Sequence, residues 1–109
     1  MRIGIVARGE RTRGIGVQSR GLYDHLDPAK VLVVDVGGFE TQPIYPEDFG
    51  PNTMVVQMSA DGTLPERKVR RWLNRLDIVL TVETFYDWRM CDWARDAGAR
   101  TCCQLNPEF

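Results

Sequence analysis

The sequence has few of the residues on which most metal and redox sites depend. Histidine occurs once, at His25, and the three cysteines, Cys91, Cys102 and Cys103, include no C-x-x-C pair. A zinc site is therefore not expected. An odd number of cysteines, two of them adjacent, also argues against a disulfide framework. We expect free, mostly buried thiols in a reducing cytoplasm, and His25 on the surface of a helix.

A strong net charge and a long hydrophobic run are also missing. The net charge of -1 provides no bulk attraction to nucleic acid or to anionic lipid, so neither is an expected partner. The longest aliphatic run, Val31 to Val34, ends at Asp35, whereas a membrane-spanning helix needs about 20 apolar residues. The 109 residues, 43% hydrophobic and 27% charged, predict one globular domain over residues 1–109.

Apolar runs alternate with amphipathic segments along the chain. The runs predict strands at residues 2–7, 30–36, 53–58, 77–82 and 100–105. The segments between them predict helices at residues 15–26, 63–76 and about 84–97. Residues 39–52, which contain three prolines, predict a long irregular loop.

Local signals mark the ends of these helices. Thr63 and Glu66 have the spacing of a capping box, and so do Thr84 and Asp87. Gly21 lies inside the first predicted helix, where glycine lowers helix stability, so we expect it to allow close packing on the sheet.

The repeated βα units predict a Rossmann-like, doubly wound α/β fold. Helices would cover both faces of a parallel sheet of about five strands, in a three-layer αβα arrangement. The strand order 3-2-1-4-5 fits best, which puts the switch point between the first and fourth strands. The polar segments 8–16, 37–52, 83–87 and 106–108 would then gather at the carboxyl edge of the sheet, where such folds bind ligands.

The segment after the first strand has the features of an anion site. It carries Arg8, Arg11 and Arg13 and ends in Gly14-Ile15-Gly16, where a helix begins. Backbone N–H groups and the positive end of the helix dipole point at one spot there. The two glycines let the main chain approach a bound group closely.

Several familiar sites do not fit this segment. Ser19 stands where the G-x-G-x-x-G dinucleotide fingerprint has its third glycine, although Asp35 is tolerable as the acidic residue of such a site. No P-loop motif and no G-x-S-x-G elbow is present. A receiver domain would need a pair of acidic residues where Arg8 stands.

Four stretches of the chain resemble the amino-terminal domain of GT-B glycosyltransferases. The resemblance is to enzymes of the family 4 and family 1 kind, phage and actinobacterial ones included, and it spans nearly the whole chain. It is carried by residues 1–7, 14–26, 77–88 and 103–109. It implies transfer of a sugar from a nucleotide-sugar donor, which is a substrate, so no cofactor is expected. A D-x-D motif is absent, which favours a mechanism without metal.

The resemblance also implies roles for individual residues. The turn with Gly14 and Gly16 would approach the donor diphosphate, and Arg8 and Arg13 would stabilise charge on the leaving phosphate. The predicted catalytic carboxylates are Glu83 and Asp87, one of which would act as base if the reaction inverts. The residues expected to line the same cleft and bind substrate are Thr84, Tyr86, Asn106 and Glu108.

Structural alternatives stand beside these roles. Thr84 and Asp87 could simply cap the third helix, and Tyr86 and Trp88 could be packing residues. The basic residues of the second helix form either a solvated face or a patch for an acidic partner or nucleic acid, and the solvated face is the simpler interpretation. They are Arg67, Lys68, Arg70, Arg71 and Arg75.

The second half of a GT-B enzyme is not part of this sequence, which ends at Phe109. The resemblance therefore predicts a domain that is inactive until a carboxyl-terminal domain or a partner subunit supplies the donor site. We also expect exposed apolar surface, and with it self-association. The alternatives are a non-catalytic α/β module that binds a nucleotide or a protein, and a small NAD(P)-type domain.

Overall fold

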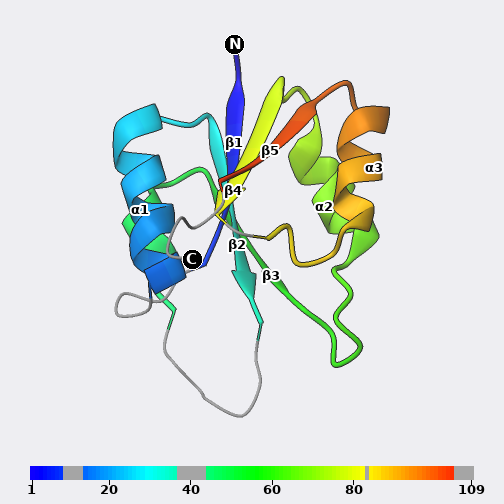
Figure 1. Ribbon diagram of the computed structural model, residues 1–109, viewed down its shortest axis with the longest axis horizontal. Coiled ribbons are helices and arrows are strands. Elements are labelled where there is room, and N and C mark those ends of the chain that lie inside the picture. The colour runs from blue at the N-terminus through cyan, green and yellow to red at the C-terminus, as the bar shows by residue number, and fades with distance from the viewer. Residues whose placement is uncertain (9–13, 37–43, 83, 105–109) are drawn as a thin grey trace.

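The computed structural model describes residues 1–8, 14–36, 44–82 and 84–104. Over these residues the chain is a three-layer α/β fold (Figure 1), as the sequence predicts. In chain order, the elements are β1 (Ile3–Ala7), α1 (Gly14–Leu26), β2 (Lys30–Asp35), the 3₁₀ helix η1 (Pro46–Phe49), β3 (Thr53–Gln57), α2 (Glu66–Leu73), β4 (Ile78–Val82), α3 (Arg89–Asp96) and β5 (Arg100–Gln104).

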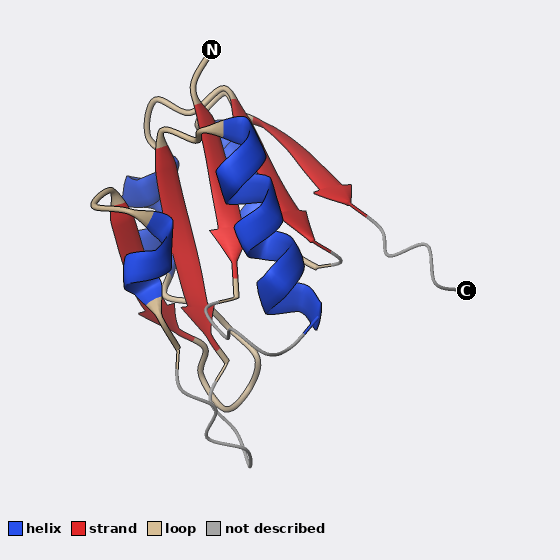
Figure 2. Ribbon diagram, turned by 90° about the vertical axis from the view of Figure 1, so that its left-hand side faces the viewer, coloured by secondary structure: helices blue, strands red, loops and turns tan. Residues whose placement is uncertain are grey.

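The five strands form one parallel sheet in the order β3-β2-β1-β4-β5, which confirms the predicted order. Ile5 of β1 pairs with Val31 of β2 on one side and with Leu80 of β4 on the other. All the strands point the same way in Figure 2, so their carboxyl ends share one edge of the sheet. We call this the carboxyl edge and the opposite one the amino edge.

Helices cover both faces of the sheet. Helix α1 packs on β1 and β4, whereas α2 and α3 pack against each other and against β3 and β5 on the other face (Figures 1 and 2). Successive residues of a strand point to opposite faces, and in β1 both kinds are apolar and buried. Ile5 belongs to the cluster beneath α1, and Val6 belongs to the larger cluster beneath α2 and α3. This pattern explains why the central strands have continuous aliphatic sequences.

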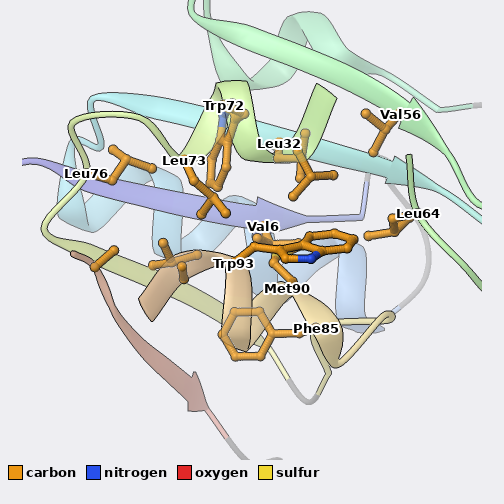
Figure 3. Close-up of a cluster of buried hydrophobic side chains, with 14 of the residues drawn as sticks. Val6, Leu32, Val56, Leu64, Trp72, Leu73, Leu76, Phe85, Met90 and Trp93 are labelled. Atoms are coloured by element: carbon orange, nitrogen blue, oxygen red, sulfur yellow. The ribbon is translucent and has the colours of Figure 1, made fainter. Parts of the chain in front are cut away.

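The larger cluster (Figure 3) includes two tryptophans, Trp72 from α2 and Trp93 from α3. Gly4 of β1 makes room for the first of them. A Cβ atom built on Gly4 would lie 2.8 Å from Trp72 Cη2 and 2.5 Å from Leu76 Cδ1. The absence of a side chain at this position therefore lets the carboxyl-terminal part of α2 settle on the sheet.

Two predicted helix starts are wrong. Helix α2 begins at Glu66, and Pro65 occupies its N-cap position without a side-chain hydrogen bond. The hydroxyl of Thr63 instead donates to Asp61 Oδ1, 2.7 Å away, so the expected capping box does not form. Helix α3 begins at Arg89 rather than near Thr84. In both places the polar side chain stabilises a turn ahead of the helix.

Three further expectations need correction. A Cβ atom on Gly21 would meet nothing within 4 Å, so this glycine does not serve close packing on the sheet. The loop expected to be irregular contains η1, whose Phe49 is buried edge-on against Tyr23 of α1. The three cysteines are free, but Cys102 is exposed and the other two are half-buried rather than buried. His25 is exposed on α1, as predicted.

Candidate functional site at the carboxyl edge

The carboxyl edge contains the switch point of the sheet. Strands β1 and β4 are neighbours, yet the chain continues from β1 toward β2 and from β4 toward β5, in opposite directions along the sheet. In open parallel sheets, connections that diverge in this way leave a crevice outside the carboxyl ends of the two strands, and ligands bind there.

One wall of this edge follows β1. Arg8 directly follows the last residue of the strand, and its backbone N–H donates to Ser19 Oγ at 3.3 Å. Ser19, which replaces the third fingerprint glycine, is buried within α1. Its hydroxyl thus ties the end of β1 to the helix. Gly14 and Gly16 lie in the first turn of α1, as predicted, while Arg13 falls outside the described residues.

The other wall follows β4 and begins with Thr81. Its buried hydroxyl lies 2.7 Å from the carbonyl oxygen of Thr84 and 3.1 Å from that of Val6 in β1. Thr84 Oγ1 in turn accepts the backbone N–H of Tyr86 at 2.9 Å. Tyr86 has a φ of 69°, a left-handed conformation that side chains seldom adopt. These contacts turn the chain sharply as it leaves the sheet.

Asp87 connects this segment to the loop that precedes α2. The residue is 6% exposed, and its Oδ2 accepts the backbone N–H of Leu64 at 2.9 Å. Arg89 supplies three donors: Nη2 at 2.7 Å from Oδ2, Nε at 3.0 Å from Oδ1, and its backbone N–H at 3.1 Å from Oδ1. The guanidinium of Arg89 lies 5.0 Å from the centre of the Trp93 ring.

The same contacts set the charge of Asp87. Hydrogen bonds from the Arg89 side chain, and then from the Leu64 and Arg89 backbones, hold its pKa below the usual value although burial opposes them. The carboxylate is therefore ionised at neutral pH and occupied by donors of the protein. This geometry gives Asp87 a structural role, and the predicted catalytic role remains a prediction.

Trp88 is the largest exposed side chain of this wall. The side chain is 59% exposed. It contacts the buried ring of Phe85 in an edge-to-face arrangement, with the ring centroids 5.8 Å apart. Packing was one of the alternatives for Trp88 in the sequence analysis, and the contact with Phe85 agrees with it, although most of the side chain is exposed.

The structure thus brings together part of the predicted site. Arg8 and the segment Thr84–Asp87 lie at the ends of the neighbouring strands β1 and β4. Glu83, Asn106 and Glu108 fall outside the described residues, so their predicted roles are not tested.

Among the described residues, no group of three or more His, Cys, Asp and Glu side chains could hold a metal ion. Within the same part of the chain, no helix has the length and apolar character needed to cross a membrane. The most exposed large hydrophobic residues there, Met1, Leu26, Val55 and Trp88, belong to four different segments. Comparisons with protein-family models, with curated proteins and with solved structures each give no match.

Proposed function

We propose that this chain is the acceptor-side domain of a glycosyltransferase that takes its sugar from a nucleotide-sugar. The observation that carries the proposal is the arrangement at the switch point. Arg8 and the first turn of α1 stand after β1, and an exposed tryptophan stands after the adjacent β4. A cation and free backbone N–H groups suit a diphosphate, and an aromatic face suits a sugar ring or a base.

In this proposal the two walls have different tasks. The β1 wall, with Arg8, Arg13 and the turn of Gly14 and Gly16, would stabilise the charge that builds up on the leaving diphosphate. The β4 wall, with Thr84, Tyr86 and Trp88, would contact the transferred sugar of the donor and orient the acceptor. Asn106 and Glu108 would add polar contacts from the segment after β5. A second domain or subunit would hold most of the donor, in the reducing cytoplasm expected from the free cysteines.

The acid–base chemistry falls to Glu83 in this scheme. Asp87 is already occupied by Arg89 and Leu64, and a carboxylate with a lowered pKa is a weak base. Glu83 comes directly after β4, beside the segment that Asp87 holds in place. Asp87 would then act as a positioning residue, and Glu83 would accept the proton of the acceptor hydroxyl if the reaction inverts.

The test is turnover of UDP-glucose by the full-length protein that contains this chain. Glu83→Gln removes the base and Gly14→Val blocks close approach to the first turn, so each should lower the rate at least about 100-fold. The control is Glu66→Gln, the same chemical change in an exposed side chain of α2. Unchanged turnover in both variants would remove these residues from the mechanism.

A second candidate is a non-catalytic module that binds a nucleotide or a protein. The pairing of Asp87 favours it, because that contact removes one of the two carboxylates on which catalysis was predicted to rest. A panel of nucleotide-sugars that bind without any turnover would favour this second function over the first.

A further inference from the structure

A second candidate site lies at the amino edge of the sheet, away from the switch point. A pocket of about 370 Å³ opens there beside the carboxyl-terminal end of α2. Its walls include Arg2, Lys30, Asn52, Arg71 and Trp72, which come from separate parts of the sequence. The volume lies within the range of small-molecule pockets, which is about 300–1,000 Å³.

The charged groups in these walls all have the same sign. The side chains of Arg2, Lys30 and Arg71 line the pocket, and none of the described carboxylates does. The pKa of Lys30 is lowered, first by burial and then by repulsion from the neighbouring positive charges of Arg2 and Arg75. An anion in the pocket would relieve this repulsion.

Two of these cations are fixed in place by backbone oxygens. Lys30 Nζ donates to the carbonyls of Trp72 at 2.8 Å and Asn74 at 2.7 Å, which close the end of α2. Arg2 Nε donates to the carbonyl of Arg75 at 3.1 Å. Because these bonds use only part of each side chain, one N–H of Lys30 and the two Nη groups of Arg2 stay available for a ligand.

The third cation has no structural task in the described part of the chain. There the Arg71 guanidinium makes neither a hydrogen bond nor an ion pair, whereas Arg70 beside it pairs with Glu66 and Asp96. The carboxyl-terminal end of a helix carries a partial negative charge of about half a unit. At the end of α2, the ammonium group of Lys30 already neutralises this charge. The positive charge in the pocket therefore exceeds what the end of α2 requires.

Trp72 adds an independent observation. The residue is 3% exposed, lines the pocket, and has an indole Nε1–H buried without a hydrogen-bond partner. Buried polar groups seldom stay unpaired in folded proteins. Because Trp72 is a lining residue, its indole signal can report on a ligand bound in the pocket.

We propose that the amino-edge pocket binds the phosphate group of a small phosphorylated molecule. Arg2 and Arg71 would supply paired guanidinium donors, which match phosphate geometry, and Lys30 would supply a point charge at the base. Inorganic phosphate shares this chemistry but would leave most of the pocket unfilled, so an ester should bind more tightly. The site does not depend on the function proposed for the carboxyl edge.

The experiment is a titration of the ¹⁵N-labelled chain, at constant ionic strength, with inorganic phosphate and separately with ribose 5-phosphate. The three tryptophans, Trp72, Trp88 and Trp93, provide one indole N–H signal each, at the pocket, the carboxyl edge and the core. We expect the Trp72 signal to shift and saturate with both compounds, and to saturate at a lower concentration of the ester.

Arg71→Gln is the decisive variant, because this exposed side chain has, among the described residues, no partner whose loss could unfold the protein. It should raise the dissociation constant about tenfold, as expected for the loss of a charge-assisted hydrogen bond. Arg67→Gln makes the same change one helical turn away and outside the pocket, and should leave the constant unchanged.

Two results would overturn the proposal: a Trp72 signal that does not move with either compound, or equal binding by Arg71→Gln and the unaltered chain. If Trp88 shifts and Trp72 does not, the first of these two results is obtained, and the carboxyl-edge site is supported instead. The two sites can therefore fail separately in one experiment.

Discussion

At the carboxyl edge, Asp87 joins the segment after β4 to the loop before α2. Asp87→Asn keeps the volume of the side chain but removes the charge that Arg89 and the Leu64 N–H bind. We expect the free energy of unfolding to fall by about 2 kcal/mol, the usual scale for hydrogen bonds to a charged group. Urea denaturation measures this change in the free energy of unfolding. Asp92→Asn breaks only an exposed pair with Arg95 and should cost less than about 0.5 kcal/mol.

The lowered pKa of Asp87 makes this contribution depend on pH. Because the pKa is lower in the folded protein than in the unfolded chain, the stabilisation is present above the unfolded value of about 3.9. It is lost as the pH falls through the folded value. The stability difference between the unaltered protein and Asp87→Asn should therefore shrink between pH 7 and pH 3. A difference that stays constant over this range would contradict the assignment of the shift.

Replacement of glycine by alanine should have opposite effects on stability at Gly4 and at Gly21. Gly4→Ala would bring a methyl group to within 2.8 Å of Trp72 and 2.5 Å of Leu76, so it should destabilise the protein by about 1–3 kcal/mol. Gly21→Ala meets nothing within 4 Å in the middle of α1, so it should stabilise by about 0.5–1 kcal/mol. Thermal unfolding of both variants measures these effects. A loss of stability in Gly21→Ala would contradict the open space around Gly21.

At the scale of elements, β1, β4 and the segment after β4 are joined by one hydroxyl. Thr81→Val removes the contacts from Thr81 Oγ1 to the carbonyl oxygens of Thr84 and Val6 while it keeps the shape of the side chain. We expect a loss of about 1 kcal/mol. Amide hydrogen exchange should also become faster at Tyr86, whose N–H is held by Thr84. Thr101→Val, a half-buried threonine in β5, is the control, and equal effects would contradict the special position of Thr81.

The strands were easier to predict from the sequence than the helix starts. The run 30–35 is buried on both faces apart from its ends, and 78–82 is buried on one face and partly buried on the other, so their composition alone indicates central parallel strands. The start of α3 could not be predicted in the same way. Thr84 and Asp87 have capping-box spacing, but each stabilises a different turn before the helix begins. The observed turn also contains a tertiary hydrogen bond from the Leu64 N–H to Asp87, which the spacing of residues in the sequence does not reveal.

At the scale of the whole molecule, the chain carries two separate polar edges. The carboxyl edge was predicted from sequence, since the βα order alone brings Arg8 and the segment after β4 together. The pocket at the amino edge was not, because Arg2, Lys30 and Arg71 are far apart in sequence and meet only when α2 packs on Gly4. The basic face of α2 was interpreted as solvated, and the structure divides it into paired Arg70 and pocket-lining Arg71.

The most direct test of the central claim is a titration of the ¹⁵N-labelled full-length protein with UDP-glucose, because the second domain would hold most of the donor. Binding is followed through the indole signals of this chain. Binding at the switch point predicts that the Trp88 signal shifts and saturates, and that Trp88→Ala and Arg8→Gln each weaken binding about tenfold. Arg67→Gln should bind as the unaltered chain does. A Trp88 signal that stays in place at saturating UDP-glucose, or unchanged affinity in both variants, would contradict a nucleotide-sugar site at the carboxyl edge.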